Sequence, residues 1–170
     1  MIGLQPDTNF LDLGCGTGWA VRHVLQLLQG EGRFIGIDIS KKMIERAKAM
    51  TKGQKNAIFH NASSEDLPLQ NNYFDNIICT FSFHHYLSPS TALSEIARVL
   101  KPKGRLFILD VTPDDFITTC LDKFLLRMQK EHVKQYSTDE FKQMFYKANL
   151  KHLKSKTVLL YPIKVHIAEK

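Results

Sequence analysis

Apolar positions in the first two thirds of the chain form short continuous runs, and these alternate with segments of helical periodicity. Near-continuous apolar runs are typical of strands that are covered on both faces. Such runs predict strands, the last of them weaker than the others, at 9–13, 33–38, 76–81, 105–111 and 57–60. Apolar residues that recur every three or four positions predict helices at 19–29, 40–50 and 89–100.

Small polar residues, proline and glycine stand where two of these helices begin and end. Ser40 is placed to cap the second helix, and Ser88 followed by Pro89 is a favourable start for the third. Pro102 and Gly104 are expected to end the third helix. The local signals therefore agree with the hydrophobic pattern.

The last third of the chain follows a different pattern. Helical spacing predicts an amphipathic helix over 114–132. An S-x-x-E capping box at Ser137 and Glu140 predicts another helix, which runs through residue 148. Two strands are expected after it, at 154–160 and 163–168.

Alternating strands and helices are joined by right-handed crossovers, and the result is a parallel sheet with helices on both faces. The predicted fold is an α/β, Rossmann-like, doubly wound seven-stranded sheet, mostly parallel with an antiparallel C-terminal strand. A chain of 170 residues suits a single domain, 1–170, in which we interpret 114–136 as a helical lid insertion. Ligands of such sheets bind beyond the carboxyl ends of the strands.

The first predicted strand breaks into three alternate glycines, Gly14, Gly16 and Gly18. Glycine adopts positive φ and has no Cβ atom, so this pattern predicts a ligand that lies against the backbone. The following helix start supplies N–H groups and the positive end of a dipole. The spacing is G-x-G-x-G and differs from the G-x-G-x-x-G dinucleotide fingerprint, which disfavours an NAD-dependent oxidoreductase.

Asp38 ends the second predicted strand, 20 residues after Gly18. A carboxylate at this position accepts hydrogen bonds from ribose hydroxyls. Cofactors of more than one class carry such a ribose, so this residue alone does not separate NAD from the others.

Six segments in one order resemble the class I S-adenosylmethionine-dependent methyltransferases, in particular the ubiquinone and menaquinone biosynthesis type. In this chain they read LDLGCGTG, GIDIS, EDLPL, FDNIIC, FSFHHYL and LKPKGRLFILD, and they extend from Leu11 to Asp110. Each segment is weak alone, whereas six in order are a strong signal. The resemblance implies S-adenosylmethionine as cofactor and methyl transfer as activity.

The resemblance also implies roles for individual residues. The methionine end of the cofactor is expected at Asp12 and the backbone of the glycine loop, namely Gly14, Cys15, Gly16 and Gly18, where N–H groups suit a carboxylate. Asp38 is expected to hold the ribose, and Ile39 to cover the adenine. The sulfonium end is expected beside the Thr80 carbonyl and Phe81.

The chain departs from the family pattern at the expected adenine amino contact. The family usually has Asp-Ala before the acidic-Leu-Pro element, where this chain has Ser63 and Ser64. A neutral hydroxyl makes a weaker bond than a carboxylate. We therefore expect weaker cofactor binding there, or participation of Glu65.

His84 and His85 follow the fourth major strand and are the candidate catalytic residues. A histidine there could act as a general base, or both could shape the pocket wall. In-line methyl transfer also proceeds by alignment alone, which contributes roughly 7 to 11 kcal/mol. Met43 and Met128 are expected to pack in the core or the cover and not to contact ligand.

The net charge is +6, and residues 122–170, with 11 basic and 5 acidic side chains, hold the whole excess. This leaves open an RNA methyltransferase, acting on tRNA or rRNA, as the alternative to a small-molecule methyltransferase. Scattered lysines are also typical of a solvated surface, which is the interpretation we favour. We expect no zinc site and no other metal, because Cys15, Cys79 and Cys120 lack ligand spacing.

No apolar run is long enough to cross a bilayer, and the first ten residues do not resemble a signal peptide. We therefore expect a cytoplasmic protein without membrane insertion. The acceptor, the methylated atom and the oligomeric state are not determined by the sequence.

Overall fold

The computed structural model describes residues 7–27, 32–114, 134–158 and 162–170. Its sheet has seven strands in the order β3-β2-β1-β4-β5-β7-β6. The strands are β1 (Asn9–Leu13), β2 (Arg33–Asp38), β3 (Ala57–Asn61), β4 (Phe74–Thr80), β5 (Leu100–Val111), β6 (Lys151–Thr157) and β7 (Ile163–Glu169). The first five are parallel, and β7 is antiparallel to both β5 and β6. The predicted fold class is confirmed.

The described helices are α1 (Trp19–Leu27), α2 (Lys41–Met50), α3 (Pro89–Val99) and α5 (Thr138–Lys147), with a 3-10 turn, η1 (Phe83–His85). None of these helices is long and apolar enough to cross a membrane. The helix predicted at 114–132, including Met128, and most of the lid insertion at 114–136 lie outside the described residues.

Two of the three predicted helix caps form as expected. The Ser40 hydroxyl accepts from the Met43 N–H, and Ser137 and Glu140 form a reciprocal capping box. Ser88 stands at the N-cap of α3 but makes no side-chain capping bond. Its hydroxyl bonds to Thr91 Oγ1 at 2.7 Å, so Pro89, at the start of α3, carries the start signal.

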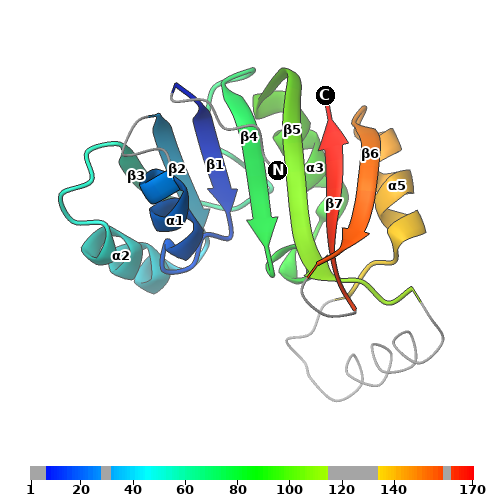
Figure 1. The fold of residues 1–170 in the computed structure, drawn as a ribbon, viewed down its shortest axis with the longest axis horizontal. Coiled ribbons are helices and arrows are strands. Elements are labelled where there is room, and N and C mark those ends of the chain that lie inside the picture. Colours follow the sequence, from blue (N-terminus) through cyan, green and yellow to red (C-terminus); the bar gives the residue numbers. More distant parts are fainter. Residues whose placement is uncertain (1–6, 28–31, 115–133, 159–161) are drawn as a thin grey trace.

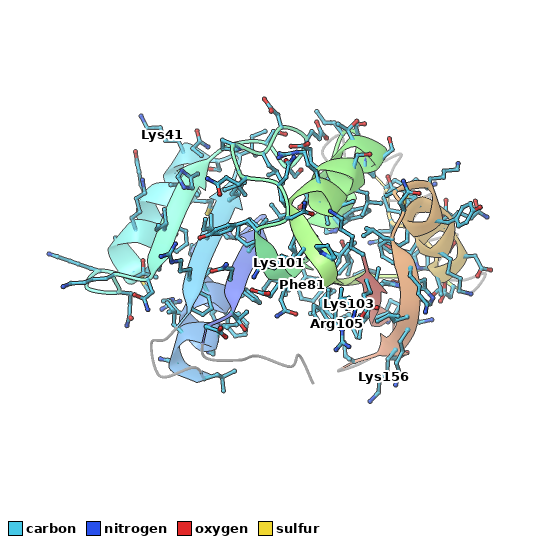
Figure 2. All side chains as sticks on the ribbon, turned by 90° about the horizontal axis from the view of Figure 1, so that it is seen from above. Lys41, Phe81, Lys101, Lys103, Arg105 and Lys156 are labelled. Carbon is cyan, nitrogen blue, oxygen red and sulfur yellow. The ribbon has the colours of Figure 1, made fainter. Side chains whose placement is uncertain are left out.

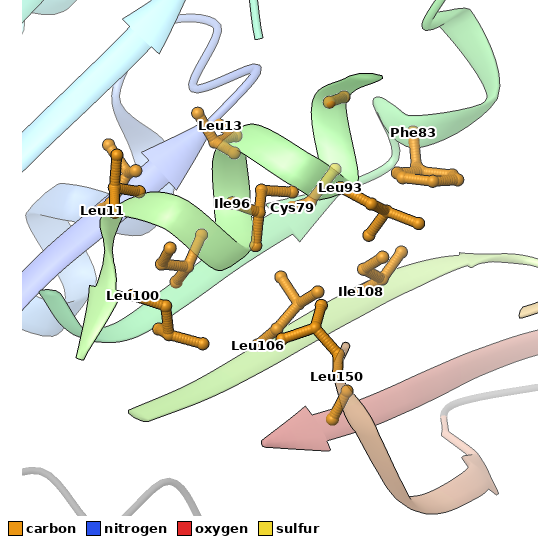
Figure 3. Packing of buried hydrophobic residues seen from close by; sticks show 14 of the residues in the cluster. Leu11, Leu13, Cys79, Phe83, Leu93, Ile96, Leu100, Leu106, Ile108 and Leu150 are labelled. Carbon is orange, nitrogen blue, oxygen red and sulfur yellow. The ribbon is translucent and has the colours of Figure 1, made fainter. Parts of the chain in front are cut away.

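Helices cover both faces of the sheet, with α1 and α2 on one face and α3 and α5 on the other (Figure 1). Each face has its own buried cluster. Figure 3 shows the cluster under α3, where Leu93 and Ile96 pack over Leu11 of β1, Cys79 of β4 and Leu106 of β5. The near-continuous apolar runs of the central strands reflect this coverage on both sides.

The strand β5 begins earlier than the sequence predicts. Leu100 pairs with Phe74, after which the register shifts so that Arg105 pairs with Asn76. Lys103 lies between these pairs at a φ of +64°. Pro102 and Gly104 therefore stand in an irregular part of a strand, because the chain pairs with β4 immediately after α3 ends.

The segment between β3 and β4 is held by α3. Arg98 donates to the carbonyl oxygens of Leu67 and Leu69 at 2.9 and 2.8 Å, while it also pairs with Glu95. Glu95 in turn accepts from the Leu67 N–H at 2.9 Å. These bonds place the chain that follows β3 along the side of α3.

A buried histidine joins the three C-terminal strands. His166 is 0% exposed, stacks on Phe141, and bonds to Thr112 Oγ1 and Ser155 Oγ at 2.9 and 2.8 Å. Burial lowers the pKa of His166 to about 4 from an ordinary value of 6.5. The folded state therefore prefers the neutral ring, and its stabilising contribution is lost as the pH falls from about 6.5 towards 4.

We expect the free energy of unfolding to fall on acidification in this window, with a contribution from His166 of about 1 kcal/mol per pH unit. His166→Gln should be less stable than wild type at pH 7.5 and should lose less stability between pH 7 and pH 5. Urea unfolding at several pH values measures both slopes. Equal slopes for the two proteins would contradict this assignment.

Candidate functional site

A cavity of about 670 Å³ opens at the carboxyl ends of β1, β2 and β4. This volume suits a small-molecule ligand. The segments that follow four strands meet there, as the parallel topology requires. The lining residues are Gly14, Gly16, Ile37, Asp38, Ile39, Ser40, Met43, Ala62, Ser63, Ser64, Glu65, Phe81, Ser82, His85, Tyr86 and Leu87.

The glycine loop differs from the prediction in its hydrogen bonding. The N–H groups of Gly14 and Cys15 both donate to the Ile37 carbonyl oxygen, and that of Gly16 donates to Asp38 Oδ2 at 2.9 Å. The expectation that these N–H groups are free for a ligand carboxylate is therefore wrong. The protein uses them to fasten the loop to β2.

What the glycine loop offers a ligand is space. A Cβ built on Gly16 meets no atom within 4 Å, and the residue has a φ of +51°. Gly18 is different, because a Cβ there would lie 3.1 Å from the Phe59 ring and 3.3 Å from Ala47 Cβ. Gly18 thus allows the start of α1 to pack closely against β3 and α2, whereas Gly16 leaves room in the cavity.

Asp38 lies at the junction of β2, the glycine loop and α2. Its Oδ2 accepts from Gly16, and its Oδ1 accepts from the Ser40 N–H at 2.8 Å. The side chain is half-buried and lines the cavity. Because each carboxylate oxygen can accept more than one bond, Asp38 fixes the loop and keeps acceptor capacity for a ligand.

Asp12 is a buried carboxylate beneath this junction. Its side chain is 1% exposed, and neither carboxylate oxygen has a hydrogen-bond partner among the described residues. Burial, with a smaller effect from the charge of Asp38, raises the pKa of Asp12 to about 7. A buried acid without a donor is costly to the fold. Such a group is a candidate for contact with a ligand that brings a donor or a positive charge.

The far wall of the cavity comes from the segment after β3. Ser63 Oγ accepts from the Glu65 N–H at 3.1 Å, and Glu65 Oε1 accepts from the Ser88 N–H at 2.7 Å. The Glu65 carboxylate is therefore fixed to the start of α3 while it lines the cavity.

The turn after β4 forms the remaining wall. β4 ends at Thr80 because Phe81 adopts a φ of +51°, a strained value for a bulky residue, and not the strand conformation that the sequence predicts. Phe81 is 45% exposed and lines the cavity together with Ser82 and Tyr86.

The two candidate catalytic histidines occupy different positions. His85 lines the cavity, whereas His84 is not among the lining residues. His84 Nδ1 lies 2.8 and 3.0 Å from the two oxygens of the buried Asp110, and its backbone N–H also donates to Asp110. The two imidazole rings are 4.0 Å apart. His84 is therefore fixed by Asp110 and packs against the His85 ring.

Nine of the predicted site residues line one cavity, and the others lie around it. Asp12 and Cys15 are buried beneath the loop, Gly18 packs against Phe59 of β3 and Ala47 of α2, and Thr80 ends β4. Burial raises the pKa of the Cys15 thiol, so it stays protonated.

Sequence reasoning missed several lining residues. Met43, which was expected to pack in the core or the cover, lies in the cavity wall because α2 begins beside the end of β2. Ser82 and Leu87 gave no spacing signal. Their position after the fourth strand was the one available clue.

Comparisons with known proteins decide the family. Residues 11–108 match the model of a family described as a methyltransferase domain. The chain belongs to this methyltransferase domain family. The resemblance inferred from the six segments is confirmed, and family membership supports S-adenosylmethionine as the cofactor.

Curated relatives of this methyltransferase domain include the uncharacterized methyltransferase YcgJ of Bacillus subtilis, 34% identical over 83% of the chain and 56% of the relative. The ubiquinone/menaquinone biosynthesis C-methyltransferase UbiE of Wigglesworthia glossinidia brevipalpis is 38% identical over 62% of the chain and 44% of the relative. The chain thus spans about half the length of these relatives. The crystal structure of Bacillus subtilis YcgJ superposes with a TM-score of 0.77, at 28% identity, over 94% of the chain and 70% of that structure.

Proposed function

We propose that the domain binds S-adenosylmethionine in the cavity at the carboxyl ends of β1, β2 and β4 and methylates a small-molecule acceptor by in-line transfer. The observation that carries the proposal is the buried, unpartnered carboxylate of Asp12 close to Asp38 and the open space at Gly16. The ammonium group of the cofactor would supply the positively charged hydrogen-bond donor that the Asp12 carboxylate lacks. Asp38 has acceptor capacity for the ribose hydroxyls.

The remaining residues fit the other parts of the cofactor. Ile39, 77% exposed at the cavity, and Met43 offer apolar surface to a purine ring. Ser63 Oγ already accepts from the Glu65 N–H, which leaves one acceptor lone pair and the hydroxyl proton for a ligand. This supports the expectation of a weaker adenine contact than an aspartate would give.

When bound, the cofactor supplies an electrophilic methyl group on a sulfonium. The strained Phe81 and the cavity-lining His85 form the wall on which we place the acceptor. Asp110 fixes His84, and the His84 ring, tilted by 48° with its centroid 4.0 Å from that of His85, packs against His85. We propose that these contacts align the acceptor, with His85 able to take a proton where the acceptor must lose one.

The proposal is tested by calorimetric titration of the chain with S-adenosylhomocysteine, with NADH as the comparison. We expect binding of S-adenosylhomocysteine and none of NADH. Binding of NADH alone would replace the proposal with an oxidoreductase, and binding of neither would overturn it.

The pairing and scatter of the lysines support our proposal of a small acceptor over RNA. Lys134, Lys142 and Lys164 are ion-paired with Glu140, Asp139 and Asp114 respectively. Other exposed lysines, such as Lys41 and Lys156, stand at opposite ends of the molecule (Figure 2).

The lysines of β6 have a structural explanation of their own. Lys151, Lys154 and Lys156 are exposed on a strand at the edge of the sheet. Charged residues there prevent pairing with other chains. Tight RNA binding with a steep dependence on salt would reverse the preference for a small acceptor.

A further inference from the structure

Ser82 joins the turn after β4 to the end of β1. Its hydroxyl donates to the Leu13 carbonyl oxygen at 3.0 Å. Ser82 Oγ also lies 3.0 Å from Cys79 Sγ, which is 3.3 Å from the Tyr86 hydroxyl. Burial raises the pKa of Cys79 to about 12, so the thiol is a neutral member of this chain of bonds. Ser82 and Tyr86 both line the cavity.

Ser82 also interlocks with the glycine loop. A Cβ built on Gly14 would stand 2.4 Å from both Cβ and Oγ of Ser82, and no real Cβ contact is that short. Gly14 also has a φ of +71°. The absence of a side chain at Gly14 is thus what allows Ser82 to reach β1.

The other side of the turn is fixed to β5. The Phe81 N–H donates to the Leu109 carbonyl oxygen at 2.8 Å, and His84 is fixed by Asp110. Phe81, with its left-handed backbone, lies between the attachment to β5 and that of Ser82 to β1. A strained residue of this kind persists when its surroundings hold it on both sides.

We propose that Ser82 is a positioning residue, which sets the separation between the glycine-loop wall and the wall formed by Phe81 and His85. The inference rests on the proposed function, in which these walls hold the methyl donor and the acceptor. Its consequence is that the contact between Ser82 and Gly14 governs cofactor affinity, beyond any effect on the stability of the fold.

The first test compares Ser82→Ala with wild type. The variant keeps the Cβ but loses the bond to Leu13, and we expect it to bind S-adenosylhomocysteine about fivefold to tenfold more weakly. Ser94→Ala is the matched control, because the Ser94 hydroxyl also donates to a backbone carbonyl, that of Ser90 at 3.0 Å, but on the exposed face of α3. The control should bind as wild type does. Urea unfolding of each variant measures stability separately.

The second test uses the interlock itself. Gly14→Ala should bind S-adenosylhomocysteine too weakly to measure, because the new methyl group collides with Ser82. Adding Ser82→Gly should restore binding to within roughly tenfold of Ser82→Gly alone, although the strain of a positive φ remains. If the contact were purely structural, the double variant would regain stability but would not regain affinity for S-adenosylhomocysteine.

The outcomes separate this inference from the proposed function. If wild type fails to bind S-adenosylhomocysteine, both are overturned. Suppose that wild type binds S-adenosylhomocysteine. If Ser82→Ala then binds it equally well, or if adding Ser82→Gly does not restore binding to Gly14→Ala, the positioning role is wrong while the proposed function stands. Should Ser82→Ala not fold, the Gly14→Ala pair alone decides.

Discussion

Replacing Asp12 by asparagine should stabilise the ligand-free protein at pH 8 and at the same time weaken its binding of S-adenosylhomocysteine. The pKa of Asp12 is raised to about 7 in the folded state, so the fold favours the protonated acid. The contribution of Asp12 to stability is therefore complete below its ordinary pKa of 3.8 and is lost as the pH rises through about 7. Asparagine does not ionise and so avoids this loss, and we expect the free energy of unfolding of the variant to be about 1–2 kcal/mol higher than that of wild type at pH 8.

The gain should shrink as the pH is lowered from 7 towards 4, because the folded wild type is then protonated. Binding of S-adenosylhomocysteine should fall by about 1.5–3 kcal/mol, which is roughly tenfold or more, because a charged partner is lost. Urea unfolding and calorimetry measure the two effects. Asp139→Asn, at an exposed carboxylate, is the control and should change neither property appreciably. A less stable Asp12→Asn variant with unchanged affinity would show that Asp12 is a structural residue.

Asp38→Ala should weaken binding of S-adenosylhomocysteine by about 1.5–3 kcal/mol, roughly tenfold to 150-fold, without unfolding the domain. The side chain is half-buried, and Ser40 retains its own capping bond to Met43. Calorimetry measures the affinity. Because Asp38 also accepts from Gly16, hydrogen exchange at the Gly16 amide should become faster in the variant.

Asp38→Asn serves as the control for this prediction. Its amide has a single acceptor oxygen, so it can replace one of the two bonds to Gly16 and Ser40, and an intermediate affinity is expected. Since the charge of Asp38 contributes to the raised pKa of Asp12, both variants should also lower that pKa. Unchanged affinity in Asp38→Ala would mean that the ribose is held elsewhere.

The sequence predicted the strands and helices well where burial is one-sided or complete. Strands β1 and β2 have the predicted limits, because their apolar runs are covered by helices on both faces. The predictions failed where the tertiary structure decides the conformation. Phe81 has a left-handed backbone because the bonds to Leu109 and Leu13 fix the turn, and β5 starts at Leu100 because β4 lies beside it.

The candidate site was predicted in its position more accurately than in its contacts. Glycine spacing and strand ends located the cavity, because parallel strands bring their carboxyl ends to one edge. The same signals could not show that the N–H groups of Gly14 and Cys15 are used by Ile37. Nor could they show that Ser82 interlocks with Gly14, since that contact depends on distances between segments far apart in the chain.

The attachment of the segment after β3 to α3 has a kinetic consequence. Glu65 is bound to the start of α3 at Ser88, and Arg98, near the other end of the helix, holds Leu67 and Leu69. We therefore expect that moving this side of the cavity away from the sheet requires these bonds to α3 to break. If the cavity binds S-adenosylhomocysteine as proposed, we expect its residence time to depend in part on the Arg98 guanidinium, although Arg98 does not line the cavity.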